Sequence, residues 1–486
     1  MMNFIIPIFS AALPEIFILC MASLILLIDV CLTERRRIMT YSLVQLTLMA
    51  TFFLVMMQYR EYSHPIITFS GHYVVDKLAI LTKLFVLGTS FFAFIYARQY
   101  IQDRHISRGE YYILGLFAVV GMLVMASAYS FLSIYLGLEL LSLSLYAMVA
   151  LQKESAVATE AAMKYFVMGA LASGLLLYGI SMLYGATGGI EIVAVGDVLH
   201  NGSQQHLVVV FALIFILSGL LFKFGAVPFH MWVPDVYDGA PTSVTLFIAS
   251  APKIAAFCIT MRILVQALPT FSVIWVPILI VIAILSMFSG NLLAIAQTNI
   301  KRMLAYSSIA HIGYTLLGLV AGPRSTTGYS AAMFYITTYV IVAAGAFAMI
   351  ALLSKQGVEL DQLDDYRGLN ARSPWLAFMM LLLMFSMAGV PPTVGFFAKL
   401  GLLEALVEAH YVWLAALALL FAIIGAYYYL RIVMLMYFEE PREALMKQPI
   451  SIAPGVMTAI TLNGVVALAL GLLPSGLIDI CRVSLG

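Results

Sequence analysis

The chain consists of long apolar stretches separated by short polar connections. A helix that spans a bilayer needs about 20 consecutive, mainly apolar residues. Counted in this way, the pattern predicts about fourteen spanning helices, at residues 4–30, 38–58, 74–97, 111–127, 129–151, 158–184, 207–226, 243–265, 272–296, 301–321, 328–354, 374–405, 411–437 and 450–475. We therefore expect an all-α polytopic membrane protein whose connections are too short to form a soluble domain.

Two of the predicted spans contain residues that interrupt a helix. The seventh contains Pro228, and the twelfth contains Gly389, Pro391 and Pro392. Proline removes a backbone donor, and backbone freed inside a bilayer persists only when it is buried in protein or lines a wet cavity. Interrupted helices in corresponding halves are typical of the ion paths of transporters. The alternative is a pair of proline kinks used only for packing.

The spacing of these interruptions predicts an internal repeat, because they lie five spans apart. Residues 111–265 form one five-helix unit and residues 272–437 form a second. An odd number of spans in each unit requires the second unit to lie inverted relative to the first, with Lys223 corresponding to Lys399. Residues 1–110 form a separate N-terminal three-helix segment, and residues 450–475 form a final helix.

The composition agrees with a membrane protein and excludes several other classes. Of the 486 residues, 63% are hydrophobic and only 10% are charged, against about 25% charged residues in soluble domains. The formal net charge of +1 argues against a nucleic-acid partner. The four cysteines lack metal-site or disulfide spacing, and no nucleotide-binding glycine loop occurs. We expect no metal or cofactor in this chain.

Basic residues are concentrated in the connections on one side of the predicted topology. The residues on that side are Arg35, Arg36, Arg37, Arg98, Arg104, Arg108, Lys153, Lys301, Arg302, Lys355, Arg367, Arg372, Arg431, Arg442 and Lys447. The opposite connections contain Arg60, Arg262, Arg324 and Arg482. Because Lys and Arg favour cytoplasmic connections, both termini are predicted on the non-cytoplasmic side.

Five ionisable residues lie deep inside apolar stretches: Glu139, Lys164, Lys223, Lys253 and Lys399. One charge at the bilayer centre costs about 2.5–3.5 kcal/mol on insertion scales, so these side chains must face each other or internal water. Burial lowers the pKa of an amine and a nearby carboxylate raises it, so moving the carboxylate lets the amine take up and release a proton. The pattern therefore predicts charge transfer across the membrane, most simply of protons.

Each of these residues also has a structural interpretation. Glu139 and Lys253 could form structural ion pairs, and Lys164 could extend its side chain to the membrane interface. His311 and His230 are possible relays because the histidine pKa lies near neutrality, although a hydrogen-bonded core histidine is an equal alternative for each. For Lys83, which has no evident partner in the sequence, we favour a packing or interface role.

Several motifs resemble the antiporter-like subunits of respiratory complex I, the proton-translocating NADH:quinone oxidoreductase. They lie at residues 136–142, 164–165, 223–237, 239–241, 249–253, 297–302, 306–314 and 389–399, so the resemblance covers nearly the whole chain. The chain lacks the long C-terminal helix of subunit L, and it has Lys399 where subunit M typically has glutamate. Lys83 departs from the family pattern.

The resemblance implies a function and a set of partners. The chain would translocate protons while other subunits, which hold FMN, iron–sulfur clusters and quinone, carry out the redox catalysis. Glu139, Lys164 and Lys223 would form the cytoplasmic-side element, Lys253 and His311 the lateral link, and Lys399 the exit. The expected location is the bacterial inner membrane, with an M-like subunit on one side and small subunits like A, J and K on the other.

Three other functions remain open from the sequence. A subunit of a multisubunit cation/proton exchanger would share these motifs, and so would a subunit of an energy-converting hydrogenase. An integral-membrane enzyme acting on lipid would need a catalytic cluster in an interface loop, and the connections offer no such constellation. Redox-dependent pumping distinguishes the first interpretation from Na⁺/H⁺ exchange without redox activity.

Overall fold

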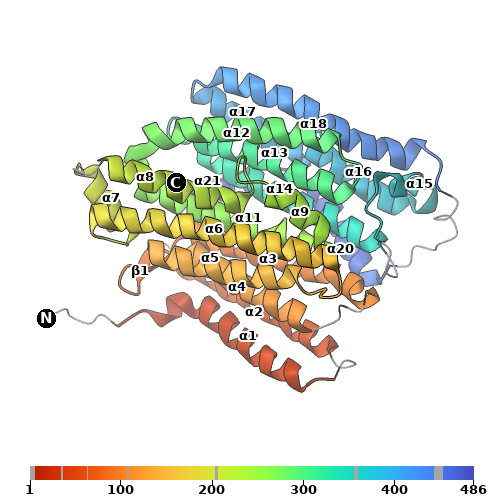
Figure 1. Ribbon diagram of the computed structural model, residues 1–486, viewed down its shortest axis with the longest axis horizontal. Coiled ribbons are helices and arrows are strands. Elements are labelled where there is room, and N and C mark those ends of the chain that lie inside the picture. The colour runs from red at the N-terminus through yellow and green to blue at the C-terminus, as the bar shows by residue number, and fades with distance from the viewer. Residues whose placement is uncertain are drawn as a thin grey trace.

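The computed structural model describes residues 6–33, 37–62, 64–104, 106, 109–202, 206–354, 359–442 and 452–485. In this part of the chain, thirteen helical segments are long and apolar enough to cross a membrane, and they run side by side in one bundle (Figure 1). Their helices are α1 (Leu13–Cys31), α2 (Ile38–Glu61), α3 (Lys77–Asp103), α4 (Gly109–Ser127), α5 (Phe131–Val149), α6 (Ala156–Thr187), α8 (His206–Phe224), α10 (Thr242–Ile248) with α11 (Ala251–Thr260), α12 (Ser272–Ile295), α13 (Ile300–Ala321), α14 (Gly328–Leu353), α18 (Val412–Phe438) and α20 (Pro454–Leu472).

The twelfth predicted span, residues 374–405, is the one not among these thirteen, because it is divided between two helices of 15 residues each, α16 (Pro374–Ala388) and α17 (Val394–Glu408). A 15-residue helix is about 22 Å long, too short to cross the hydrocarbon core of about 30 Å alone. Together the two halves replace one spanning helix. The predicted all-α membrane fold is confirmed.

Both predicted interruptions are present, and each begins at a glycine. Gly225 (φ +75°) follows the last residue of α8, and Gly389 (φ +84°) follows the last residue of α16. Glycine ends a helix in this left-handed conformation without the steric penalty of a Cβ atom. After Gly225 the chain turns into the short α9 (Trp232–Gly239), and after Gly389 it turns into α17.

A third interruption, which the sequence analysis did not predict, divides the eighth span. α10 ends at Ile248 and α11 begins at Ala251, with Ser250 between them in a non-helical conformation (φ −116°, ψ −104°). Pro252 lies in the first turn of α11, where its missing N–H leaves no helical bond unmade. The break places Lys253 in the first turn of a new helix.

Small residues bring the helices close together. A Cβ atom on Gly121 of α4 would lie 2.7 Å from the carbonyl oxygen of Gly137 on α5. A Cβ atom on Gly313 of α13 would lie 2.8 Å from the carbonyl oxygen of Ala283 on α12. Small residues let membrane helices approach to van der Waals contact, so these two helix pairs are tightly fixed.

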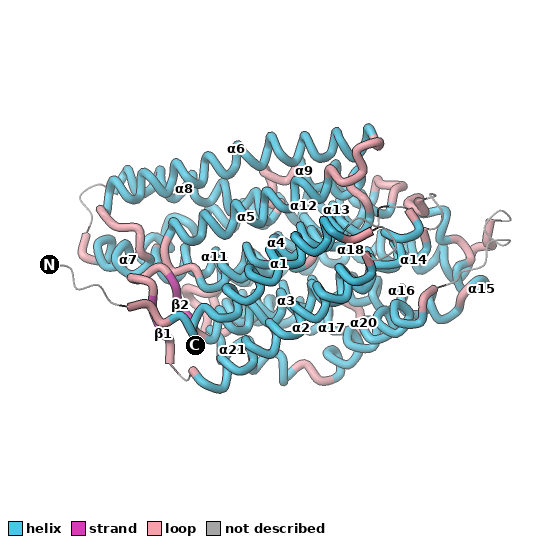
Figure 2. The backbone as a smooth tube through the Cα atoms, turned by 90° about the horizontal axis from the view of Figure 1, so that it is seen from below, coloured by secondary structure: helices cyan, strands magenta, loops and turns pink. Residues whose placement is uncertain are grey.

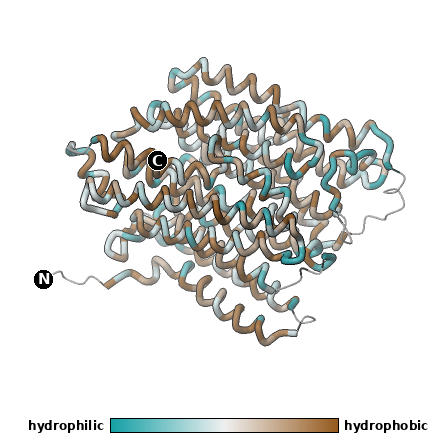
Figure 3. Tube along the Cα trace, viewed as in Figure 1, coloured by the Kyte–Doolittle hydropathy of each residue, from teal (hydrophilic) through white to brown (hydrophobic). Residues whose placement is uncertain are grey.

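The two ends of the bundle carry different short elements. One end holds the antiparallel hairpin β1 (Ile66–Thr68) and β2 (Tyr73–Val75), with α7 (Ile192–His200) and α21 (Ser475–Leu485) (Figure 2). The opposite end holds η5 (Leu363–Tyr366) and α15 (Leu369–Arg372), where hydrophilic residues gather (Figure 3). The remaining short elements are η1 (Phe9–Ala12), η3 (Met261–Ala267) and η4 (Pro269–Phe271).

The basic connections lie partly outside the described residues. Arg35, Arg36, Arg108, Lys355 and Lys447 all fall in undescribed segments. Of the others, Arg104, Arg367 and Arg442 form ion pairs with acidic residues of the connections near η5.

A buried polar axis as the candidate functional site

Lys223 of α8 reaches the face of α5 that carries Glu139. Lys223 lies in the last turn of α8, and its Nζ atom donates a hydrogen bond to Ser142 Oγ at 2.7 Å. Ser142 is three residues after Glu139, so both lie on one face of α5. Glu139 is half-buried, and its Oε1 atom is buried without a hydrogen-bond partner among the described residues.

Lys253 lies almost fully buried beside the break in the eighth span. Its side chain is 3% exposed, and its Nζ atom donates to Ser308 Oγ on α13. The ammonium also lies 5.9 Å from the ring centroid of Tyr237 and 5.2 Å from that of Tyr339. Aromatic faces attract cations, so Lys253 occupies a site of one hydroxyl and two rings.

His311 is enclosed by tyrosines. Its Nδ1 atom is 2.7 Å from the hydroxyl of Tyr335, and its Nε2 atom is 2.9 Å from the hydroxyl of Tyr429. The imidazole stacks on Tyr339 with centroids 4.6 Å apart, on the ring that also faces Lys253. His311 is therefore a fully hydrogen-bonded residue within the same cluster as Lys253.

Lys399 extends the row toward the twelfth-span interruption. Its Nζ atom donates to the carbonyl oxygens of Met387 and Ala388, at 3.0 and 2.8 Å. Lys399 and His311 both line a cavity of about 20 Å³, which is room for about one water molecule. Lys399 also lines a second, apolar groove of about 450 Å³ between α13, α16, α17 and α18, and among the described residues that line this groove it alone is charged.

Two of the predicted site residues lie away from this row. Lys164 is 43% exposed and forms ion pairs with Glu160 at 2.9 Å and Asp235 at 2.8 Å. His230 lies in the turn after Gly225, half-buried, and its Nδ1 atom has no partner in the described part of the chain. The structure therefore joins Lys223 to Ser142, on the face of α5 that also carries Glu139, and it pairs Lys164 with Asp235.

Asp235 and Glu359 both lie outside the spanning helices and carry perturbed carboxyl groups. Burial raises the pKa of Asp235, but hydrogen bonds and charges from Lys164 and Arg302 outweigh it and hold this pKa below its usual range. Burial also raises the pKa of Glu359, but the charges of Lys301 and Arg104 outweigh this effect and hold the pKa below its usual range. Both carboxylates are therefore ionised near neutral pH.

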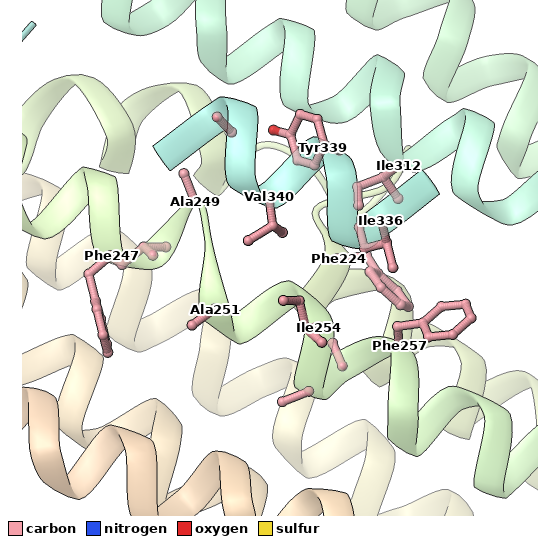
Figure 4. Close-up of a cluster of buried hydrophobic side chains, with 14 of the residues drawn as sticks. Phe224, Phe247, Ala249, Ala251, Ile254, Phe257, Ile312, Ile336, Tyr339 and Val340 are labelled. Carbon is pink, nitrogen blue, oxygen red and sulfur yellow. The ribbon is translucent and has the colours of Figure 1, made fainter. Parts of the chain in front are cut away.

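No described hydrogen bond or ion pair joins Lys223 to Lys253. The residues that follow them, Phe224 and Ile254, belong to an apolar cluster with Phe257, Ile312 and Ile336 (Figure 4). The polar axis therefore has two parts. One contains Glu139 and Lys223, and the other contains Lys253, His311 and Lys399.

A second set of buried charges lies outside the axis. Lys83 is fully buried and pairs with Glu15 at 2.6 Å, and the hydroxyl of Tyr73 bonds to both side chains. Arg262, also fully buried, makes a bidentate pair with Asp76 at 2.6 and 2.7 Å. The packing role favoured for Lys83 thus takes the form of a buried ion pair. Glu15 lies fifty-eight residues from Tyr73 in the sequence, so no local sequence pattern predicts this contact.

Sequence reasoning also missed the polar neighbours of the axis. Ser142, Ser308, Tyr335 and Tyr429 hold the charged residues, yet serine and tyrosine in apolar helices carry no distinctive pattern. The described residues include no group of three or more His, Cys, Asp or Glu side chains that could hold a metal ion.

A bundle with interrupted helices and a row of buried lysines defines an antiporter-like membrane protein, and comparison with known proteins gives the same class. Residues 128–425 match the family described as NADH:quinone oxidoreductase/Mrp antiporter, TM. Proteins named NADH-quinone oxidoreductase subunit N are 53% identical in Thiobacillus denitrificans, over 98% of both chains, and 52% identical in Thioalkalivibrio sulfidiphilus, over 99% of this chain and 98% of that one. The chain belongs to the NADH-quinone oxidoreductase subunit N family.

Solved structures agree with this assignment. A chain of respiratory complex I from Thermus thermophilus is 32% identical, with a TM-score of 0.81 over 97% of this chain and 100% of that one. A chain of the Mrp complex from Dietzia shares the fold, with a TM-score of 0.85 at 20% identity over 98% and 97% of the two chains. The predicted family is confirmed, and with it the predicted role as an antiporter-like membrane subunit of complex I.

Proposed function

We propose that this chain moves protons across the membrane through Glu139, Lys223, Lys253, His311 and Lys399, driven by electron transfer from NADH to quinone in partner subunits. The observation that carries the proposal is the row of ionisable groups held by hydroxyls, rings and carbonyls inside an apolar bundle. Ionisable residues at membrane depth are costly and mark ion or proton pathways. A purely structural role would more simply be met by apolar side chains.

Each residue has a distinct part in the proposed transfer. Glu139 and Lys223 form the entry element, and Ser142 accepts the hydrogen bond of Lys223 and so holds the lysine on the face of α5 that carries Glu139. Lys253 and His311 carry the proton laterally, and Lys399 receives it by way of the small cavity that it shares with His311 and then releases it. Lys164 is held by Asp235 away from the row, and His230 lies at the interruption that follows Lys223; both act as supply residues for the entry element.

The apolar cluster around Phe224 and Ile254 limits the transfer between Lys223 and Lys253. A proton crosses an apolar gap only if water enters it, and wetting of an apolar constriction is an energetic barrier. The two parts of the axis therefore exchange protons only when the cluster opens. A change in the charge of Glu139 or Lys223 is the event that admits water.

Membership of the family supports a proposal for the partners. The redox cofactors, FMN, iron–sulfur clusters and quinone, belong to other subunits, and an M-like subunit and small subunits like A, J and K flank this chain in the bacterial inner membrane. The end of the bundle with η5 and α15 is the cytoplasmic end, so that both termini are non-cytoplasmic.

We also propose that residues 111–265 and 272–437 are two inverted repeats. In each unit, the residue before the second helix pairs with a residue after the third helix: Ser130 with Glu191, and Asn299 with Gln362. Each pair is flanked by two backbone hydrogen bonds in the same register. In addition, each unit interrupts its fourth helix at a glycine of positive φ. The N-terminal segment 1–110 and the helix in 450–475 lie outside the repeats.

Substitution of the entry element tests the proposed function. Lys223→Ala and Glu139→Ala should each lower NADH-driven acidification of inside-out membrane vesicles, and coupled NADH–quinone turnover, by about tenfold or more, while the complex still assembles. Lys153→Ala, at an exposed lysine of the connection before α6, is the matched control. Wild-type pumping in both substituted complexes would overturn the proposal.

A further inference from the structure

A continuous set of hydroxyl groups surrounds His311 and reaches a third helix, α18. Tyr429 of α18 contacts His311 Nε2 at 2.9 Å, and its hydroxyl also bonds to Ser307 Oγ. On the other side of the ring, the hydroxyl of Tyr335 contacts Nδ1 at 2.7 Å. All four side chains are buried, with 1–6% of their surface exposed. No solvent molecule is needed to join these groups.

The imidazole between two phenols is able to pass a proton. A neutral imidazole has one N–H donor and one acceptor nitrogen, so one tyrosine hydroxyl donates to the ring while the other accepts from it. A proton supplied to Ser307 from the Lys253 end lets Ser307 give its own hydroxyl proton to Tyr429, and Tyr429 gives its own to Nε2, which forms the imidazolium. The Nδ1 proton then leaves to Tyr335, whose own hydroxyl proton passes into the cavity that holds Lys399. Each hydroxyl receives one proton and gives one, so no net charge remains on either phenol or on the serine.

One end of this hydroxyl set lies at the cavity of Lys399, and the other end lies one residue from the serine that contacts Lys253. Tyr335 lines the small cavity that also contains His311 and Lys399. Ser307 precedes Ser308, whose hydroxyl accepts the hydrogen bond of Lys253. The sequence of groups from Lys399 is therefore the cavity, Tyr335, His311, Tyr429 and Ser307, which ends one residue from the Lys253 contact.

A side branch ends at an amide. The hydroxyl of Tyr428 lies 3.1 Å from Tyr429 and 3.1 Å from Asn291 Oδ1. Asn291 Nδ2 is held by the carbonyl oxygens of Met287 and Phe421, at 2.9 and 3.2 Å. An amide does not release a proton at neutral pH, so this branch positions Tyr429 without conducting.

We propose that Tyr429 is a catalytic proton-relay residue, whose hydroxyl exchanges protons with His311 Nε2 and Ser307 Oγ and so connects the Lys253 and Lys399 ends of the axis. The inference rests on the proposed function of proton translocation. Tyr428 and Asn291 act as positioning residues for it. Tyr335 is the relay on the Lys399 side of the ring.

The first test is Tyr429→Phe in the assembled complex. Loss of the hydroxyl should lower vesicle acidification and coupled turnover by about tenfold or more and should increase the slowing caused by D₂O. The matched control is Tyr111→Phe, which removes a fully buried hydroxyl bonded to the backbone carbonyl of Ser243 at 3.0 Å and should leave both measurements unchanged. Wild-type acidification and isotope effect in Tyr429→Phe would overturn the proposal.

A second measurement separates relay from packing. A fluorinated tyrosine at position 429 keeps the ring and the hydroxyl but makes the hydroxyl more acidic. A relay role requires the pH profile of coupled turnover to shift, and an unshifted profile contradicts it. If Lys223→Ala abolishes pumping while Tyr429→Phe is normal, the relay fails and the proposed function stands. If Lys223→Ala and Tyr429→Phe both pump normally, the relay and the proposed function are both contradicted.

Discussion

Lys223 and Lys399 both place an ammonium group at the carboxyl end of the first half of an interrupted helix. The two lysines belong to opposite sides of the interruption in their own helix. Lys223 belongs to the last turn of α8 itself. Lys399 belongs to α17, the second half-helix, and donates back to the last two carbonyls of α16. The negative end of a helix dipole stabilises a cation, so both half-helices favour the charged amine.

This arrangement changes the expected correspondence between the two units. The spacing of the interruptions in the sequence pairs Lys223 with Lys399. When the interruptions are matched through Gly225 and Gly389, the residue equivalent to Lys223 is Met387, two positions before the glycine. If the two proposed repeats are matched in this way, each has a lysine amine at the end of its first half-helix, but from a different position in the chain. Direct comparison of the two half-sequences could not detect this.

The charge at Lys399 must be removable for the proposed transfer, and Lys399→Arg tests this. Arginine keeps a positive charge but does not lose its proton in proteins. We expect vesicle acidification to fall by about tenfold or more, because a fixed charge cannot act as a proton carrier. Lys153→Arg on the exposed connection is the control. Normal pumping by Lys399→Arg would show that this side chain contributes only charge.

The position of Lys399 also depends on Gly389. A Cβ atom at this glycine would lie 2.9 Å from Lys399 Cδ, and the backbone φ of +84° is strained for any other residue. Gly389→Ala should therefore displace the lysine and lower coupled turnover, with a loss of stability of about 1–2 kcal/mol. The matched control is Gly401→Ala in the same α17 helix, where nothing lies within 4 Å of the added Cβ.

Gly401→Ala should slightly stabilise the helix, because glycine is a poor helix former. Turnover and thermal unfolding of the purified complex distinguish the two glycine variants. Equal behaviour of Gly389→Ala and Gly401→Ala would mean that the interruption tolerates a side chain and does not set the place of Lys399.

How much of the site the sequence predicts depends on the residue type. Isolated charges in apolar stretches are conspicuous, so Glu139, Lys223, Lys253 and Lys399 could be found without a structure. The interruption at Ser250 cannot be predicted from the sequence, because a single proline, Pro252, is compatible with the first turn of a helix.

The partners of these charges could not be predicted for a different reason. Tyr429 reaches His311 from 118 residues away, and Arg262 reaches Asp76 from 186 residues away. Such contacts are set by how the helices pack, and the composition of each single helix does not reveal its neighbours. Hydropathy locates the spans, but it leaves the order of helices around the axis undetermined.

Glu359 provides a pH-dependent contact that supports the eighth span. Its carboxylate accepts hydrogen bonds from Thr242, the first residue of α10, at 2.9 Å and from Tyr100, and it pairs with Arg104 at 3.1 Å. Glu359→Gln should lower the stability of the complex by about 1.5–3 kcal/mol at neutral pH, the range for a hydrogen bond to a charged group.

The sign of the pH dependence follows from the lowered pKa of Glu359. A carboxyl group whose pKa is lower in the folded state stabilises it at pH values above the unfolded pKa, and this contribution is lost as the pH falls through the folded pKa. The stability difference between the wild type and Glu359→Gln should be constant from about pH 8 to pH 5 and should shrink below about pH 4.5. A difference that grows on acidification would contradict this assignment.

The buried pair of Arg262 and Asp76 fixes the N-terminal segment to the helix that carries Lys253. Asp76 caps α3 by accepting a hydrogen bond from the Ala79 N–H at 2.8 Å, and Arg262 follows α11 in η3. Removal of one partner leaves the other charge buried and unpaired, which costs about 3–5 kcal/mol. We expect Arg262→Met to weaken the complex to this extent, measured by thermal unfolding, and to lower coupled turnover.

The double substitution Asp76→Leu with Arg262→Met identifies the cause. Because replacing a buried ion pair by apolar residues is often neutral or stabilising, the double variant should regain most of the stability lost in Arg262→Met. If turnover returns together with stability, the pair only holds α3 and α11 in contact. If stability returns and turnover stays low, Arg262 also influences Lys253, nine residues earlier on the same helical segment. A double variant no more stable than Arg262→Met would instead show that the packing of the arginine side chain, and not its unpaired charge, accounts for the loss.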